Sequence, residues 1–579
     1  MATRAIEIPA ARWVFTKGMF WQNLVLLVTA VFVLIPLVFL VLGSFSTARL
    51  PTEFSLEKMG LENYAAVWLD PGTYRLFYNT AVYVGGATAI GITTAAILAW
   101  LVERTNMPGK IWLYAGIPMT LAVPGLLQAM AWVLLLSPRA GFINRWLMDL
   151  FDTTTPFINI YTLGGMAAIE GLRLVPTAFL MLVPLLRSMD PSLEEAAAVS
   201  GAPPHSMLRK ITLGLMVPGI AAVTIYQAMT ALEVFEIPGV LGMPVGLHVF
   251  ATKIYAILQS NEVLPVFGQA NALGMLYLLI GLTAAGFYWY LIRRSERYTV
   301  VTGKGYRPRV LDLGKWRWPA LGLVFLFLFL SIGLPFLVML YTSLVPFLQP
   351  PSWAVLSKLT WEHYELVFGY PKFERTFWNT VIMVVATATA TCIASFFISL
   401  VIVRTKFWGR RTLDQIAFVP HAIPGIVAGI AFLWLFLNID MFGTITSIVI
   451  GFTVGFIAYG TRAMNAAILQ IHKDLEEAAG VSGAPPWRTM IRVFFPLMLP
   501  TFIGLWIWVV LLAVRIAGLP LVLYEGPKNQ VLAVLIWNMW DEGDIEAVGA
   551  IGVLLMTSLF VLVLMLRFIG FGRGVVQSR

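Results

Sequence analysis

Long apolar runs constrain the fold of this chain more than any other feature. A helix of about 20 apolar residues is long enough to cross the hydrocarbon core of a bilayer. With 59% hydrophobic and only 12% charged residues, the composition is that of a membrane protein rather than of soluble domains. We predict an all-α membrane protein with twelve transmembrane helices, at 24–43, 79–101, 111–136, 161–186, 213–235, 268–292, 319–343, 377–403, 413–438, 446–470, 495–520 and 546–568.

Basic residues predict the topology, because Lys and Arg accumulate in short cytoplasmic loops. A cytoplasmic N-terminus places most of the 39 Lys and Arg residues on the inner side, so the net charge of +9 needs no nucleic acid to explain it. The first apolar run is too long for a signal-peptide core and is expected to remain as an anchor. Residues 1–21 are expected to form an interfacial helix, with a frayed tail as the alternative.

The chain contains an internal repeat. RLFYNT at 75–80 returns as RTFWNT at 375–380, and LEEAAAVSGAPP from Leu193 returns as LEEAAGVSGAPP from Leu475. The first pair is 300 residues apart and the second 282, which places an 18-residue insertion in the first half, in the outer segment from Ser137. Six spans, an even number, separate the two polar stretches, so both fall on the same side of the membrane. The halves are therefore parallel repeats, not inverted ones.

We expect two six-helix halves, at 22–292 and 319–568. A basic cytoplasmic linker at 293–318 joins them, and residues 569–579 form a cytoplasmic tail. Both termini are therefore expected in the cytoplasm.

Each polar stretch predicts a short helix, a turn and the start of a second helix. Gly201 and Gly483 follow the first helix as C-terminal stops. Ser192 with Glu195, and Asp474 with Glu477, have the spacing of a capping box. The alanines leave a smooth helix face that the groove of another protein can approach closely. An ordinary cytoplasmic hairpin is the alternative. The near identity of the two copies, while most transmembrane residues differ, favours an interface.

These stretches resemble the cytoplasmic EAA loops of the membrane subunits of bacterial ABC importers, which end in Gly and continue to an I-x-L-P step. The first copy has Gly214 in place of the final Pro, and the second has Val493 and Phe495 in place of Ile and Leu. The EAA...G core is intact in both. The matching residues are Glu195, Ala196, Ala197 and Gly201 in the loop at 190–212, and Glu477, Ala478, Ala479 and Gly483 in the loop at 472–494.

This resemblance implies the type I importer permease fold in a bacterial inner membrane, with a pseudo-twofold axis between the halves. Each loop would then be a coupling helix docked in a cleft of an ATP-binding subunit. We expect two such subunits, as a homodimer that binds ATP and Mg, and a separate periplasmic solute-binding protein. The chain has no G-x-x-x-x-G-K-[ST] phosphate loop, so we expect neither ATP hydrolysis nor another enzymatic activity from it.

Two further stretches, ALEVFEIPGVLGMPVGLHVFATKIY from Ala231 and YGTRAMNAAILQIHKDLEEAA from Tyr459, look most like the permeases of ferric-iron importers. Similar permeases serve thiamine, polyamines and aminoethylphosphonate, and fold likeness alone does not fix the cargo. Ferric iron is therefore the first expectation for the solute, and a small organic solute is the alternative. A secondary transporter driven by an ion gradient is the alternative from another class, but it would have no use for docking loops.

The residues themselves predict no resident metal or cofactor. The five histidines do not cluster in the sequence, and the single cysteine, Cys392, excludes both an intrachain disulfide and a cluster of thiolates. Neither a cofactor motif nor a nucleophile with a base stands out.

Charged residues inside the spans are the remaining candidates for function. Glu170 and Arg173 have the spacing of a pair on one helix face. At the 282-residue offset, Glu233 in span five corresponds to Arg515 in span eleven. The fifth span of each half lines the pathway in the resembling importers. We therefore hypothesise that Glu233 and Arg515 face each other as an ion-pair gate or as a polar station for the solute, with Glu236 at the outer mouth. Alternatively, both lie at the outer interface and meet water separately.

Overall fold

The computed structural model describes residues 20–187, 213–259, 266–295 and 310–574, with single residues at 197, 199–201, 203 and 206. Within this part of the chain, nine helices are long and apolar enough to cross a membrane, or twelve if each of three bent helix pairs is one span. Each of the twelve predicted spans coincides with one of these helices or pairs. The interfacial helix predicted for 1–21 and most of the linker lie outside the described residues.

The spans of the first half are α1 (Phe20–Phe45), α3 (Pro71–Arg104), α4 with α5 (Lys110–Met119, Gly125–Leu136), α7 (Leu163–Arg187), α10 with α11 (Leu213–Glu233, Glu236–Gly242) and α13 (Phe267–Ser295). Those of the second half are α14 with α15 (Arg317–Leu328, Leu334–Leu344), α18 (Phe373–Arg404), α19 with α20 (Arg410–Phe418, Gly425–Asn438), α21 (Ile445–Gln470), α24 (Phe495–Arg515) and α27 (Ile545–Gly574). Shorter helices connect them, namely α2 (Glu62–Leu69), α6 (Phe142–Leu150), α12 (Phe250–Leu258), α16 (Trp353–Leu356), α17 (Glu362–Gly369), α22 (Lys473–Val481), α23 (Pro486–Thr489), α25 (Gly518–Leu523) and α26 (Leu532–Glu542).

The spans are broken at corresponding places in the two halves. The third span bends by 91° before Gly125, and its counterpart α19–α20 bends by 109° before Gly425. A proline precedes each glycine, and because proline lacks an N–H and restricts the residue before it, the first helix ends there. The fifth span bends by 55° between α10 and α11, and α24 likewise ends at Arg515 just before α25.

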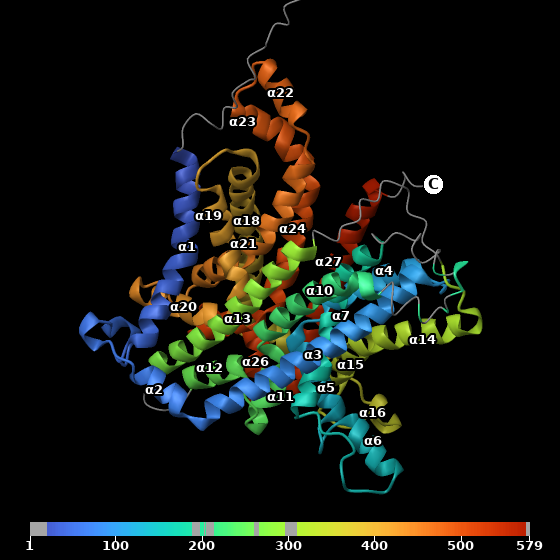
Figure 1. Ribbon diagram of the computed structural model, residues 1–579. Coiled ribbons are helices and arrows are strands. Elements are labelled where there is room, and N and C mark those ends of the chain that lie inside the picture. The colour runs from blue at the N-terminus through green and yellow to red at the C-terminus, as the bar shows by residue number, and fades with distance from the viewer. Residues whose placement is uncertain are drawn as a thin grey trace, which may run out of the picture.

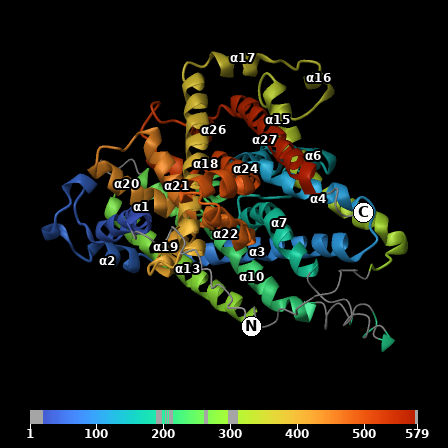
Figure 2. The ribbon, with the colours of Figure 1, turned by 90° about the horizontal axis from the view of Figure 1, so that it is seen from above.

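The first helix of each half packs against the opposite half. α1 contacts α20 as well as α13 of its own half, and α15 contacts α5 as well as α27 of its own half. Seen from above, α1 lies beside α13 and α20, and α15 lies beside α27 (Figure 2). Figure 1 shows α18, α21 and α24 running together toward α22, whereas α3 and α14 run in a clearly different direction. The two halves therefore interlock through their first helices.

The repeated motif RLFYNT/RTFWNT contains an asparagine that performs the same task in each half. Asn79 Nδ2 donates a hydrogen bond to the carbonyl oxygen of His248 at 2.9 Å, and Asn379 Nδ2 donates to that of Gln530 at 3.0 Å. Each bond ties the second span of its half to the segment that follows the broken fifth span. Since buried backbone carbonyls need a hydrogen-bond donor, this task explains why the motif recurs.

The predicted insertion after Ser137 contains α6, which projects from the end of the molecule opposite α22 (Figure 1). Asn144 holds the insertion closed, because its Nδ2 donates to the carbonyl oxygens of Leu136 at 2.9 Å and Ile158 at 2.7 Å. The insertion is thus a compact extension of the first half.

Candidate functional site

The second polar stretch folds as the predicted helix, turn and helix. α22 ends at Val481, and Gly483 follows two residues later with a φ of +71°, the left-handed conformation that favours glycine. Gly201 has the same conformation in the first loop, with φ +79°, so both predicted C-terminal stops are confirmed. The capping box predicted for Asp474 and Glu477 is wrong, and the one predicted for Ser192 and Glu195 lies outside the described residues. The cap of α22 is His472, whose Nδ1 accepts the N–H of Asp474 at 3.4 Å, and Asp474 lies inside the first turn.

The helix α22 presents part of its EAA motif to solvent at one end of the molecule (Figure 1). Glu477 and Ala478 are exposed and Ala479 is half-buried, whereas the neighbouring Glu476 is only 5% exposed. The two successive glutamates therefore face opposite ways. In the first loop Ala197 is half-buried, while Glu195 and Ala196 lie outside the described residues.

The last residue of α18, Arg404, holds α22 against the spans. Its Nε lies 3.1 Å from Oε1 of Glu476, and both side chains are buried. Its Nη2 donates to the carbonyl oxygens of Ile468 at 2.7 Å and Ile471 at 2.5 Å, at the end of α21. Its guanidinium also lies 5.7 Å from the ring centroid of Phe494, at the start of the eleventh span. One guanidinium therefore joins three spans to α22.

The first half contains the counterpart of this arginine. Arg104 is the last residue of α3, and its Nη2 donates to the carbonyl oxygen of Leu186 at 3.0 Å. Leu186 corresponds to Ile468 at the 282-residue offset. Glu194, the counterpart of Glu476, lies outside the described residues.

A cavity of about 190 Å³ lies where the broken spans of the two halves meet. Its wall includes a residue beside each break, namely Gly125, Val234, Ile423 and Ile516. Interrupted helices leave backbone groups free, and inside a membrane such backbone is tolerated only where protein or a cavity surrounds it. The polar side chains on the wall are Arg173, Thr230, Glu233, Glu236, His421, Tyr459 and Arg515.

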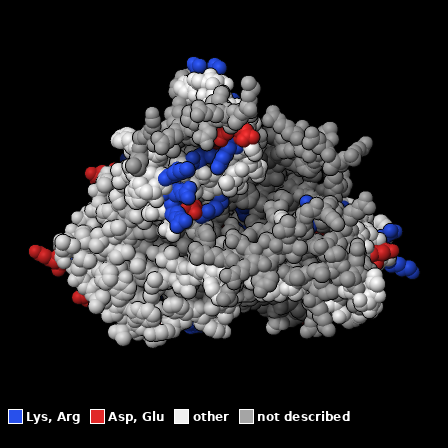
Figure 3. All heavy atoms as spheres, turned by 45° about the horizontal axis from the view of Figure 1, so that its top comes forward, with Lys and Arg blue, Asp and Glu red and all other residues white. Residues whose placement is uncertain are grey.

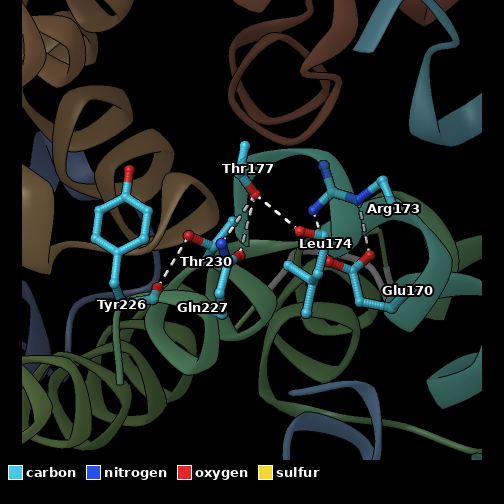
Figure 4. Close-up of polar contacts among 7 residues, drawn as sticks. All are labelled: Glu170, Arg173, Leu174, Thr177, Tyr226, Gln227 and Thr230. Atoms are coloured by element: carbon cyan, nitrogen blue, oxygen red, sulfur yellow. Dashed lines mark hydrogen bonds and ion pairs between the residues drawn. The ribbon is translucent and has the colours of Figure 1, made fainter. Parts of the chain in front are cut away.

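The predicted pair on the fourth span is confirmed. Arg173 donates from Nε and Nη2 to the two carboxylate oxygens of Glu170, at 2.8 and 2.7 Å, as Figure 4 shows. Glu170 is fully buried. One helical turn further along, Gln227 donates to the hydroxyl of Thr177 at 3.0 Å and ties α10 to α7.

The three predicted pathway residues all line the cavity. Glu233 ends α10, Glu236 begins α11 and Arg515 ends α24. Within the described residues, no hydrogen bond or ion pair joins Glu233 to Arg515, and the charge that acts on the Glu233 carboxylate is that of Arg173. The contact between the halves is instead made by Glu236, whose Oε1 accepts the N–H of Ala517 at 2.8 Å.

Sequence reasoning assigned no role to His421, which also lines the cavity. Its ring lies 5.5 Å from that of Tyr226 and 5.0 Å from that of Tyr459, so its buried position is explained by ring packing. No group of three or more His, Cys, Asp or Glu in the described part of the chain is placed to hold a metal ion.

These features define a multi-pass membrane protein with broken spans around a cavity that carries several charged side chains, and with a helical loop at one end. Residues 87–297 and 392–574 match the family of inner membrane components of binding-protein-dependent transport systems. The two matches cover more than half of the chain, which therefore belongs to this family of inner membrane permeases, without catalytic activity of their own.

A putative ferric transport system permease protein of Haemophilus influenzae is 27% identical over 425 residues, which cover 72% of this chain and 64% of that protein. A ferric transport system permease protein of Actinobacillus pleuropneumoniae is 26% identical over 493 residues, which cover 83% and 69%. The match thus spans slightly less than two thirds of the Haemophilus protein. Among solved structures, a bacterial alginate ABC transporter in complex with an alginate-bound periplasmic protein aligns at 20% identity and a TM-score of 0.41, over 50% of this chain and 99% of that one.

Proposed function

We propose that this chain is the permease of an ATP-driven importer and passes a solute from a periplasmic binding protein to the cytoplasm. The observation that carries the proposal is the doubled polar loop, whose second copy is a partly exposed helix fixed to three spans by Arg404. Two identical ATP-binding subunits, which hold ATP and Mg, would each need one such docking helix. An ion-gradient transporter would need none.

The residues that contact the ATP-binding subunits are those of the EAA motifs. In the second loop they are Glu477, Ala478, Ala479 and Gly483, and in the first loop Glu195, Ala196, Ala197 and Gly201. Glu476 is held by its ion pair with Arg404, whereas Glu477 is exposed and forms no ion pair with a described residue. Glu477 is therefore available to contact a partner protein.

The halves 22–292 and 319–568 are related by a pseudo-twofold axis, with the linker at 293–318 between them. Three features support this relation, namely the matching breaks in the spans, the exchanged packing of α1 and α15, and the bonds of Asn79 and Asn379. Such a relation gives both coupling loops the same orientation toward the ATP-binding subunits.

The coupling loops and both termini lie on the cytoplasmic side. Support comes from the charge distribution, because basic residues accumulate on that side of membrane proteins. Figure 3, with the end that carries α22 turned forward, shows Lys and Arg gathered on that face. Exposed basic residues in the inner segments of the second half are Lys406, Arg410, Arg411, Lys473, Arg488 and Arg492.

Ferric iron is the proposed cargo, because the chain is similar over most of its length to two permeases named for ferric transport. The charged side chains on the cavity wall, Glu233, Glu236 and Arg515, suit a solute that carries polar or charged groups. A small organic solute such as thiamine, a polyamine or aminoethylphosphonate is the alternative within the same class.

Purification of the tagged chain with its partners tests the class and the cargo together. We expect ATP-binding subunits to co-purify, and elemental analysis of the cognate periplasmic protein to find iron. Reversing the charge of the motif glutamate in both loops, with Glu195→Arg and Glu477→Arg, should remove the ATP-binding subunits while the permease stays folded. An organic solute on the binding protein would replace iron as the cargo, and transport by the chain alone would overturn the mechanism.

A further inference from the structure

Arg515 is a buried cation without a hydrogen-bond or ion-pair partner among the residues that the structure describes. The residue is 8% exposed, and its Nε is buried without a hydrogen-bond acceptor. No hydrogen bond or ion pair joins this side chain to any residue that the structure describes, although it lies on the wall of the central cavity. Because a buried charge without a hydrogen-bonded counter-charge is costly, the position favours an anion that hydrogen-bonds to Arg515, which no described carboxylate does.

The two carboxylates whose negative charge acts on Arg515, those of Glu236 and Glu170, accept hydrogen bonds from other groups. Arg515 feels the positive charge of Arg173 and the negative charges of Glu236 and Glu170. Glu170 gives both carboxylate oxygens to Arg173, and Glu236 accepts the Ala517 N–H through Oε1. Neither carboxylate is therefore hydrogen-bonded to Arg515.

A second guanidinium faces the same space. Arg173 uses Nε and Nη2 for Glu170 and lines the cavity together with Arg515. Arg173 lies against the backbone of Gly125, where an added Cβ atom would be in ordinary contact, 3.4 Å from Cδ of Arg173. Two guanidiniums from opposite halves thus meet one cavity.

The cavity has room for a small anion between these groups. Its volume of about 190 Å³ is several times the roughly 30 Å³ that one water occupies in the liquid. Gly455, which stands where Arg173 stands in the first half, also lines the cavity, and a Cβ added there would meet no atom within 4 Å. The second half therefore leaves open space where the first half has a charge.

We propose that Arg515, flanked by Arg173, binds an oxyanion group of the solute, a carboxylate or a phosphate, inside the central cavity. A guanidinium donates to such groups through two parallel N–H bonds, which the unpartnered side chain of Arg515 has free. This proposal rests on the proposed function, since it identifies the chemistry of the solute that passes through the permease. The oxyanion comes either as a ligand of the transported ferric ion, whose charge Glu233 would balance, or as part of an organic anion.

Thiol modification tests the site without depending on transport. Leu512 lines the cavity one turn before Arg515, on the same face of α24. We would introduce Leu512→Cys in a Cys392→Ser background, in the whole complex in nanodiscs. The rates of modification by sulfonate-bearing and trimethylammonium-bearing methanethiosulfonates are then compared.

The anionic reagent should react faster than the cationic one, and Arg515→Gln should lower this ratio by about tenfold. Inorganic phosphate and citrate should slow the modification in the wild-type background but not in Arg515→Gln. Arg515→Lys should retain part of the anion preference, and Arg492→Gln, which removes an exposed charge at the other end of the same span, should retain all of it. An unchanged ratio and unchanged protection in Arg515→Gln would overturn the proposal.

Uptake into proteoliposomes distinguishes the two sources of the oxyanion. With the binding protein and ATP present, radiolabelled iron and radiolabelled citrate or phosphate should enter together if the oxyanion travels on the metal. Entry of the labelled oxyanion without iron would keep the site and identify an organic or inorganic anion as the cargo. Iron uptake that continues unchanged in Arg515→Gln would uphold the proposed function and contradict this inference.

Discussion

The guanidinium of Arg404 and the carboxylate of Glu476 lie 3.1 Å apart and connect the end of α18 to the docking helix α22. The same guanidinium holds the last carbonyls of α21. In the proposed function, a force that an ATP-binding subunit applies to α22 would therefore reach α18 and α21 directly through this side chain. Glu476 directly precedes the motif glutamate Glu477. The side chain of Glu476 is buried against the spans, whereas that of Glu477 is exposed.

Removing this ion pair should uncouple ATP hydrolysis from transport. Because a buried pair loses its compensation when one partner is removed, Arg404→Gln and Glu476→Gln should each lower the solute transported per ATP hydrolysed by about tenfold, within the usual range of coupling free energies. The measurement is uptake and phosphate release in the same proteoliposomes. Arg411→Gln, at an exposed position nearby, is the matched control. Wild-type coupling in the Arg404→Gln variant would show that the pair transmits nothing.

The same pair predicts a dependence on pH. Burial raises the pKa of Glu476 above its ordinary value of 4.5, and Arg404 opposes this shift. A carboxyl group whose pKa is raised where α22 packs on the spans binds protons more tightly in that packed state. The packing of α22 on the spans is therefore weakened as the pH rises through the raised pKa. Without Arg404 the pKa rises further. Coupling in Arg404→Gln should therefore fall more steeply than in wild type between the ordinary carboxyl pKa and neutral pH, and parallel profiles would contradict this account.

The left-handed conformation at Gly483 predicts a sensitive position. Gly483→Ala places a Cβ atom at φ +71° and should destabilise the end of α22 by about 1 kcal/mol. The affinity of the purified ATP-binding subunit for the permease in nanodiscs should then fall by about fivefold. Gly480 lies inside α22 without a positive φ, so Gly480→Ala should leave the affinity unchanged or raise it. Equal effects at the two positions would argue against a requirement for this turn.

The proposed gate between Glu233 and Arg515 predicts the outcome of a charge exchange. These side chains share a cavity wall without an ion pair in this conformation, so the pair would form in another step of the transport cycle. Glu233→Arg alone should abolish most uptake, because it adds a third guanidinium beside Arg173 and Arg515. Adding Arg515→Glu should restore part of it, as measured by initial uptake rates. Equal loss in the single and double variants would leave pairing unsupported.

The features that could be predicted from the sequence are those that depend only on residues close together in the chain. Span positions follow from apolar length, and the pair of Glu170 with Arg173 follows from a spacing of three residues on one helix. The stops at Gly201 and Gly483 follow from the need for a positive φ.

The features that could not be predicted depend on how distant segments pack. Arg404 and Glu476 are far apart in sequence, and the bond from Ala517 to Glu236 joins opposite halves. Sequence spacing alone also favoured Asp474 as the helix cap. Only the backbone geometry of the loop identifies His472 instead.

The most direct test of the central claim is solute uptake by the reconstituted complex. Proteoliposomes that contain the permease and both ATP-binding subunits, with iron-loaded binding protein outside and ATP inside, should accumulate radiolabelled iron. Accumulation should stop without ATP, without the binding protein, or with the Glu195→Arg and Glu477→Arg variant. ATP-independent accumulation driven by an ion gradient, or accumulation by the chain alone, would contradict the claim that two docking loops couple this permease to ATP hydrolysis.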